Sequence, residues 1–204
     1  MVHLKSRFLS VTLFILTLFP CNAQLADTTN YNLKDIQLRQ TNFNKISMIS
    51  LNSWAVVNIG YGTIASFNSG GEAKYFHQMN AIWNTVNLAI GIPGIIGAYK
   101  KRDQMGFEEL YKTQQKMQAI YLFNAGLDVG YMMAGLSARL YGRTLTGTDA
   151  IRFKGYGSSL IMQGGYLFVH DLISFYLLKS NKSLFDKEWG RVRFIGTGAV
   201  LEFK

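Results

Sequence analysis

Four stretches of the chain are apolar and long enough to cross a membrane as helices. They are Ile46–Phe67, Met79–Tyr99, Met117–Ala138 and Tyr156–Leu178. A helix that rises 1.5 Å per residue needs about twenty such residues to cross roughly 30 Å of hydrocarbon. Tyrosine, lysine and arginine gather at the ends of the stretches, as they do where spanning helices meet lipid headgroups. The pattern predicts an all-α membrane protein, with a four-helix transmembrane bundle over residues 46–178.

The first residues have the three-part plan of a secretory signal peptide. Basic residues open it, an apolar run follows from Phe8 to Phe19, and Cys21-Asn22-Ala23 resembles a cleavage site. The run is too short for a spanning helix, so we expect residues 1–23 to be a signal peptide and 24–45 a polar N-terminal segment. The single cysteine lies in the signal. The mature chain would then have no thiol for a disulfide, a metal site or a nucleophile.

The C-terminal tail, residues 179–204, has a different period. Hydrophobic and polar residues alternate in Val192–Phe194 and again in Ala199–Phe203, on either side of Gly196-Thr197-Gly198. Alternation around a glycine-rich turn predicts a small β-hairpin.

An outer-membrane β-barrel is the alternative fold. A signal peptide, many tyrosines and glycines, and a last strand near the C-terminus also occur in such barrels. Against it, Leu160–Leu178 is nearly continuous apolar sequence, whereas barrel strands alternate. The helical bundle is therefore the favoured prediction.

Polar and small residues follow one face of each predicted helix. In Met79–Tyr99, Asn80, Asn84 and Asn87 are separated by steps of four and three, which places them on one stripe. Polar side chains that face lipid would lack hydrogen-bond partners, so the four stripes should face one another. The predicted intramembrane polar cluster comprises Asn58, Asn80, Asn84, Asn87, Asn124, Asp128, Gln163 and His170.

Asp128 lies near the middle of its predicted span. An ionised aspartate at the centre of a bilayer costs about 2.5–3.5 kcal/mol, so it must be neutral, paired or hydrated. We expect His170 to be its partner, and Asp171, on another face, to lie at the membrane surface. Two interpretations stay open: the cluster joins helices by hydrogen bonds, or Asp128 and His170 form a site for a proton, an ion or a ligand.

A second stripe on the third predicted helix consists of small residues. Gly126, Gly130 and Ala134 are four residues apart, which allows another helix to approach closely. This neighbour would be the second or fourth predicted helix, or a second copy of the chain.

Composition and charge narrow the functional classes. Charged residues are 16% of the chain and the net charge is +9. The basic residues stand between apolar stretches without the aromatic–basic motifs of nucleic-acid binding, which favours contact with anionic lipid headgroups. No histidines and carboxylates have zinc spacing, and no cofactor motif or catalytic set is present, so we expect no metal, cofactor or catalytic residue. The signal peptide and the positive-inside rule predict opposite orientations of the chain across the membrane.

Several motifs resemble a known family. They are Trp54-Ala55-Val56-Val57-Asn58-Ile59-Gly60-Tyr61-Gly62, the run from Tyr75 to Asn87, Asp128-x-Gly130-Tyr131 and Gln163-Gly164. Over residues 45–175 the chain resembles an uncharacterised family of multi-pass bacterial membrane proteins, filed as a domain of unknown function. The resemblance implies four spans and a Gram-negative source, and it supplies no activity.

Two functions remain as hypotheses. The favoured one is a non-enzymatic structural or accessory component of the bacterial inner membrane, multi-pass, which acts through a membrane protein partner or as a homo-oligomer. The alternative is a small transporter or channel-like protein with a polar path centred on Asp128 and His170.

Overall fold

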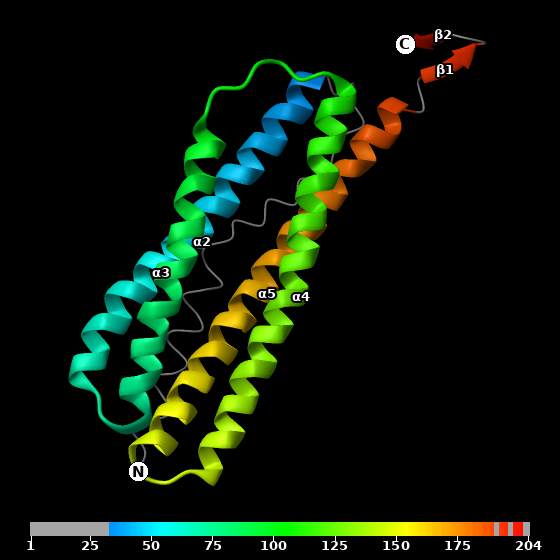
Figure 1. The fold of residues 1–204 in the computed structure, drawn as a ribbon. Coiled ribbons are helices and arrows are strands. Elements are labelled where there is room, and N and C mark those ends of the chain that lie inside the picture. Colours follow the sequence, from blue (N-terminus) through cyan, green and yellow to red (C-terminus); the bar gives the residue numbers. More distant parts are fainter. Residues whose placement is uncertain (1–32, 190–191, 196–197, 202–204) are drawn as a thin grey trace, which may run out of the picture. The chain divides into compact units, whose positions relative to one another are not determined.

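The computed structural model describes residues 33–189, 192–195 and 198–201, with side chains for residues 33–180. Four helices make up most of this part of the chain (Figure 1). They are α2 (Leu33–Asn68), α3 (Gly71–Tyr99), α4 (Phe107–Thr144) and α5 (Gly147–Trp189). Each contains one of the four predicted stretches, so the prediction of four helices is confirmed. The helical course of residues 33–189 contradicts the β-barrel alternative. The predicted signal peptide, residues 1–23, lies outside the described residues.

All four helices begin earlier than the apolar stretches, and the extensions are longest in α2 and α4. α2 starts at Leu33 rather than Ile46, and α4 starts at Phe107 rather than Met117. Both extensions are rich in charged and amide side chains, which favour water over lipid but are compatible with a helix. A search for apolar stretches finds only the part of each helix that is poor in charged residues.

Two short strands follow the helices. β1 (Val192–Ile195) pairs with β2 (Gly198–Leu201) in antiparallel register, with Val192 opposite Leu201 and Ile195 opposite Gly198.

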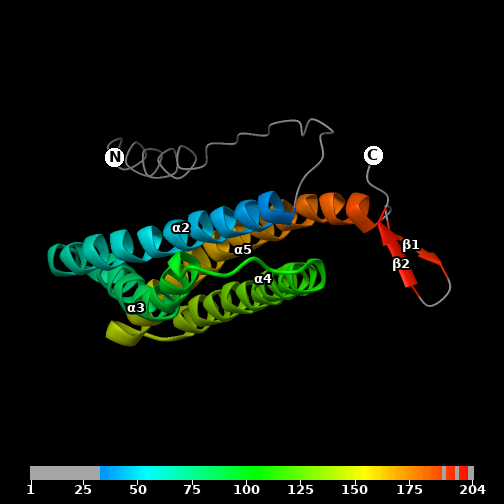
Figure 2. The ribbon, with the colours of Figure 1, turned by 90° about the horizontal axis from the view of Figure 1, so that it is seen from above.

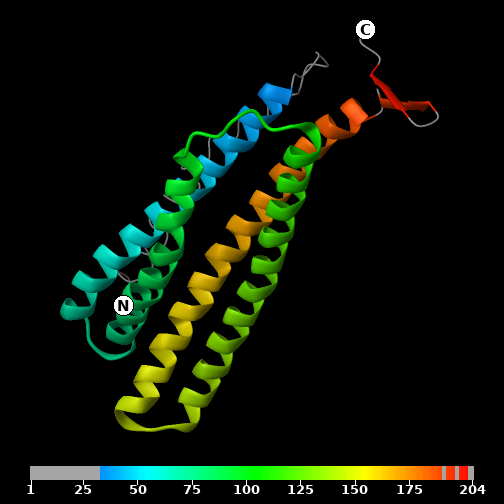
Figure 3. The same cartoon turned by 45° about the horizontal axis from the view of Figure 1, so that its top comes forward.

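Glycines make the two tight turns of the bundle. Gly71 begins α3 with φ +59°, and Gly147 begins α5 with φ +63°. These are left-handed conformations, which glycine adopts without the steric penalty of a Cβ. The turns fold α2 back on α3 and α4 back on α5, giving two helical hairpins (Figures 1 and 2). The hairpins meet mainly through α3 and α5, while α2 has fewer contacts with α4 and α5. Figure 3 shows the same arrangement from a third angle.

Glycines also set how closely the helices approach. A Cβ added to Gly135 of α4 would lie 2.6 Å from the carbonyl oxygen of Gly157 in α5. A Cβ on Gly62 of α2 would lie 2.8 Å from the carbonyl oxygen of His77 in α3. Any larger residue at these positions would push the helix backbones apart.

The small-residue stripe Gly126, Gly130 and Ala134 is not at these contacts. A Cβ on Gly126 or Gly130 would meet no atom of the described chain within 4 Å, and Ala134 is exposed. Of the neighbours expected for this stripe, another described helix of the same chain is therefore excluded, and a second copy of the chain stays a prediction. α4 instead meets α5 through the face that carries Asp128, Gly135 and Gly142, which lies on the other side of the helix.

The bundle is polar inside and apolar outside. Its buried side chains include more polar residues than hydrophobic ones. Large hydrophobic side chains are exposed on every helix, among them Val57 (64%) on α2, Ile90 (68%) on α3, Phe123 (68%) on α4 and Tyr176 (62%) on α5. Soluble proteins expose scattered apolar residues, whereas a large contiguous apolar surface marks contact with a membrane or a partner.

By length and hydropathy alone, one described helix, α3, could cross a membrane. One such helix is weak support for a membrane location, because core helices of soluble proteins meet the same criterion. Only 17% of the apolar stretch of α3 is buried, however, which a core helix would not show.

One end of the bundle has the opposite polarity. There Ile36 of α2 and Leu110 of α4 are buried together, at 1% and 0% exposure, and Met105, Phe107 and Tyr111 pack against them. This small hydrophobic core lies where the helices carry most of their charged residues.

Candidate functional site

An amide network joins three helices in the bundle interior. We define it as Trp54 and Asn58 of α2, Asn80 of α3, and Ser159 and Gln163 of α5. The Gln163 side chain is fully buried, and its Nε2 donates to Asn80 Oδ1 at 3.1 Å and to Asn58 Oδ1 at 3.4 Å. Its Oε1 accepts from Trp54 Nε1 at 2.8 Å. Ser159 Oγ donates a second hydrogen bond to Asn80 Oδ1. Gln163 is therefore the centre of this network.

The stripe on α3 continues from the amide network by bonds within the helix. Asn84 Nδ2 donates to the carbonyl oxygen of Asn80 at 2.8 Å, and Asn87 Nδ2 donates to Asn84 Oδ1 at 3.3 Å. The five buried residues of α3 are Asn80, Asn84, Asn87, Gly91 and Ala98. All lie on one helix face, at steps of four, three, four and seven.

A histidine network joins α2, α4 and α5. We define it as Ser47 of α2, Tyr121 of α4, and His170, Asp171 and Ser174 of α5. His170 Nδ1 lies 2.8 Å from Asp171 Oδ1, and His170 Nε2 lies 3.3 Å from Ser47 Oγ. Ser47 Oγ also lies 2.9 Å from Tyr121 Oη and 3.5 Å from Ser174 Oγ. All five side chains are buried, at 6% exposure or less.

Stacked aromatic rings lie between the two networks. The ring of Tyr166 stacks on Trp54, with ring centres 3.8 Å apart and planes 6° from parallel. The centre of the Tyr166 ring also lies 6.2 Å from the centre of the His170 ring. The hydroxyl of Tyr166 lies 3.3 Å from Ser50 Oγ. Polar and aromatic groups thus form a continuous series through the bundle from Asn80 to Tyr121.

Asp128 belongs to neither network. It is 3% exposed, and its Oδ2 has no hydrogen-bond partner among the described residues. Its backbone lies against Gly164 of α5, where an added Cβ would come within 2.8 Å of the Asp128 carbonyl oxygen. The absence of a Cβ at Gly164 lets α4 carry Asp128 into the bundle interior.

The partner predicted for Asp128 is bound elsewhere. His170 hydrogen-bonds Asp171 and Ser47, and no hydrogen bond or ion pair joins it to Asp128 in the described structure. The expectation that Asp171 lies exposed at the membrane surface is also wrong, because it is 6% exposed. α5 packs against α4, α3 and α2, so its buried face is wide enough to take two consecutive residues.

The other predicted site residues lie as follows. Asn58, Asn80 and Gln163 meet in the amide network, and Asn84 and Asn87 continue it along α3. His170 is in the histidine network. Asn124 is half-buried and takes part in neither network.

Ser47, Tyr121 and Gln114 are interior polar residues that the sequence prediction missed. Gln114 is 1% exposed, and its Nε2 donates to the carbonyl oxygen of Leu178 at 2.7 Å. Tyr121 and Gln114 lie seven and fourteen residues before Asp128, on the same face of α4. Continuing the α4 stripe toward the N-terminus from Asp128 would have found Tyr121 and, beyond the apolar stretch, Gln114. Continuing the α2 stripe in the same direction from Asn58 would have found Ser47.

The connectivity Asp171–His170–Ser47 is that of a hydrolytic triad, but the surroundings do not suit hydrolysis. Ser47 lies inside α2, where backbone N–H groups bond to carbonyls one turn earlier and cannot stabilise an oxyanion. Its Oγ is already shared with Tyr121 and Ser174, and it is 5% exposed. The network can hold helices together and can pass a proton along hydrogen bonds.

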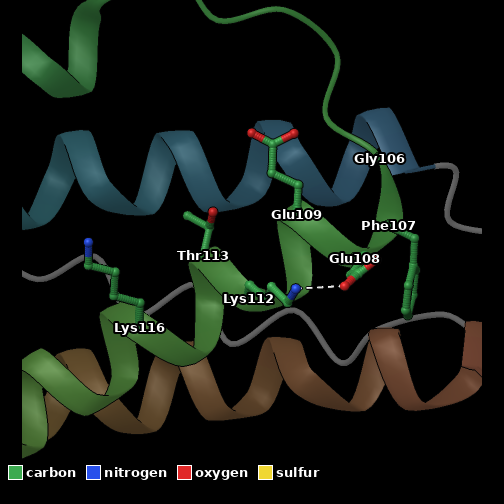
Figure 4. A pocket seen from close by; sticks show the side chains of 7 residues that line it. All are labelled: Gly106, Phe107, Glu108, Glu109, Lys112, Thr113 and Lys116. Atoms are coloured by element: carbon green, nitrogen blue, oxygen red, sulfur yellow. Dashed lines mark hydrogen bonds and ion pairs between the residues drawn. The ribbon is translucent and has the colours of Figure 1, made fainter.

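A different group of charges lies at the start of α4. A shallow pocket there is lined by Gly106–Glu109, Lys112, Thr113 and Lys116 (Figure 4). Lys112 Nζ lies 2.6 Å from Glu108 Oε1, and this hydrogen bond and the lysine charge lower the pKa of the Glu108 carboxyl. Both side chains are largely exposed, so the ion pair adds little stability. Lys116 lies one turn further along α4.

No three histidine, cysteine, aspartate or glutamate side chains group as metal ligands in the part of the chain that the structure describes.

Comparison with known proteins gives one family. The family of unknown function DUF6992 matches residues 50–172, which contain most of the four helices and both polar networks except Ser47 and Ser174. No curated protein and no solved structure is significantly similar to the chain.

Proposed function

The chain belongs to the family of unknown function DUF6992, and we propose that it is a multi-pass integral membrane protein without enzymatic activity. In this proposal α2 to α5 cross the bacterial inner membrane, and the interior networks hold the helices together. The protein acts as a structural or accessory component, through a membrane partner or a second copy.

The observation that carries the proposal is the inverted polarity of the bundle. Buried amides, hydroxyls and His170 bond to one another across helices, and Asp171 bonds to His170 within α5. Large hydrophobic side chains point outward on all four helices. In water, the exposed hydrophobic surface would favour association or aggregation. In lipid, the same arrangement keeps the polar groups inside the protein, where the two networks bond them to one another, and places the apolar ones against acyl chains.

The change of polarity along the helices supports a membrane boundary. Between Ile46 and Gly70 the sequence holds no charged residue, whereas the buried pair Ile36 and Leu110 lies among lysines and glutamates. A helical bundle in water buries its hydrophobic residues and exposes its charged ones. The extension of α2 and α4 around Ile36 and Leu110 thus lies beyond the lipid in this proposal.

Membrane fractionation tests the location. The full chain, expressed in a Gram-negative host, should remain with the membranes after extraction with alkaline carbonate and should be released by detergent. Recovery of folded chain in the soluble fraction, without detergent, would refute the proposal.

A transporter or channel-like function is the second candidate, and the histidine network together with unpartnered Asp128 favours it. Intramembrane ionisable groups commonly mark ion or proton pathways. In liposomes this candidate requires pH-dependent flux that Asp128→Asn abolishes while the helical content is retained. The structural proposal instead expects no flux, and it expects Asp128→Asn and His170→Gln to change stability alone.

A further inference from the structure

A pocket of about 360 Å³ lies between α2 and α4, next to the end of α3. α2 and α4 have few direct contacts, which leaves room between them at this end of the bundle. The pocket lies near the change of polarity described above, with the buried pair Ile36 and Leu110 on the same stretches of α2 and α4. It is therefore placed where lipid headgroups would meet the protein.

The α2 wall of the pocket is polar along its whole length. Gln37, Gln40, Thr41 and Asn44 follow the steps three, one and three, which places them on one helix face. Amides and hydroxyls donate hydrogen bonds without bringing a charge. No aspartate or glutamate lines the pocket.

Two cations complete the polar part. Arg102 comes from the connection between α3 and α4, and Lys116 comes from α4. Among the described residues neither forms an ion pair, whereas nearby Lys112 is taken by Glu108. The pocket therefore carries two positive charges without a neutralising acid.

The connection that carries Arg102 is fixed to α2. Gln37 Nε2 donates to the carbonyl oxygen of Asp103 at 2.9 Å, and Gln37 Oε1 accepts from the backbone N–H of Met105 at 3.0 Å. These two bonds hold the chain just after Arg102. The arginine is thus presented to the pocket by a positioned segment and not by a free loop.

The α4 wall turns apolar toward the bundle. Met117 and Ile120 lie one and four residues after Lys116, and Gly97 and Ala98 of α3 face the same space. Ile120 is 48% exposed and lies in the apolar stretch that begins at Met117. The pocket thus has two cations and a polar α2 wall, and its apolar lining comes from α3 and α4.

Given the membrane location proposed above, we infer that this pocket binds the headgroup of an anionic phospholipid. Arg102 and Lys116 contact the phosphate, Thr41 and Asn44 of α2 bind the polar glycerol headgroup, and Met117 and Ile120 contact the first part of the acyl chains. Arginine and lysine are the usual phosphate ligands in proteins, and basic sites between spanning helices bind such headgroups.

The test measures binding of a short-chain phosphatidylglycerol to the purified full chain in detergent, where no bilayer surface charge contributes. Short-chain phosphatidylcholine and inorganic phosphate are the comparison ligands. The variant Arg102→Gln with Lys116→Gln removes both cations. Lys100→Gln with Lys101→Gln is its matched control, since these exposed lysines carry the same charge but do not line the pocket.

Phosphatidylglycerol should bind the wild type more tightly than phosphatidylcholine does. Loss of one charge-assisted hydrogen bond corresponds to about a tenfold loss of affinity, so the pocket variant should bind at least about tenfold more weakly. The control should bind as the wild type does. Circular dichroism should show the same helical content in all three proteins.

Three outcomes would overturn the inference: equal affinity of the pocket variant and its control, equal binding of the two lipids, or inorganic phosphate binding as tightly as phosphatidylglycerol. The last would make the pocket a site for free phosphate. The carbonate extraction is independent of these measurements. A chain that stays in the membrane but fails the lipid test refutes the pocket alone.

Discussion

Asn80 is the residue through which α3 joins the amide network. Its Oδ1 accepts from both Ser159 and Gln163 of α5. We expect Asn80→Ala to leave Ser159 without this bond and Gln163 Nε2 with Asn58 as its remaining partner, which costs about 1–3 kcal/mol of stability. Thermal unfolding in detergent, followed by circular dichroism, measures the effect.

Thr85→Ala on the same helix is the matched control. Thr85 is exposed, and its hydroxyl bonds only to the carbonyl oxygen of Ala81 in its own helix. Its loss should change stability by less than about 0.5 kcal/mol. If the two variants unfold alike, Asn80 does not join the helices.

His170 and Asp171 should depend on each other. Removing one partner of a buried hydrogen bond leaves the other unsatisfied, whereas removing both leaves neither. We expect His170→Leu and Asp171→Leu to be destabilising alone, and the double variant to cost less than their sum by about 0.5–3 kcal/mol. Additive costs in a double-mutant cycle would contradict the pairing that the 2.8 Å distance indicates.

The residues of the site could be predicted where they repeat at helical spacing inside an apolar stretch. Asn80, Asn84 and Asn87 are the clearest case, because their spacing alone places them on one face, and the structure buries all three. Asp171 could not be predicted in this way. Its burial depends on how many helices surround α5, which the sequence of α5 does not encode by itself.

The contact between α4 and α5 gives a prediction at the scale of the helices. Gly157→Ala places a methyl group against the backbone of Gly135, so the helices must separate. Overpacking of this kind costs about 1–3 kcal/mol. Gly130→Ala on the open side of α4 meets nothing within 4 Å, and since alanine is favoured over glycine in a helix by about 0.5–1 kcal/mol, it should not lower the thermal stability of the monomer.

The pair of glycine variants also separates folding from association. Should Gly130→Ala lower stability as much as Gly157→Ala does, the open face of α4 is packed by a partner. Chemical cross-linking of the wild type would then identify a second copy or another protein.

The sequence predicts the helices better than it predicts their neighbours. Each helix has its own apolar stretch, so number and order follow from local pattern. All four helices carry a polar stripe, however, and stripes of similar composition do not indicate which helices meet. The contact of α3 with α5 depends on Asn80, Ser159 and Gln163 lying at matching depth, which only the folded arrangement reveals.

At the scale of the whole molecule, the proposed membrane predicts which positions water reaches. In a Cys21→Ser background, a thiol at Lys101→Cys should react with a membrane-impermeant maleimide, and one at Ile90→Cys should not. Ile90 is 68% exposed on the protein surface, but a thiol in hydrocarbon cannot ionise, and the thiolate is the reactive form. Equal labelling of the two variants in intact proteoliposomes would place Ile90 in water.

The two-hairpin arrangement has a consequence for how the protein is made. Each hairpin closes through a short glycine turn and its own glycine contacts, so each can form as soon as its two helices have been synthesised. Assembly is then a separate, later event, in which the second hairpin docks on the first through Asn80 and Gln163. Two half-chains, divided between Arg102 and Asp103 and produced together, should therefore find each other in the membrane and co-purify. Asn80→Ala should weaken that complementation without reducing the amount of either half.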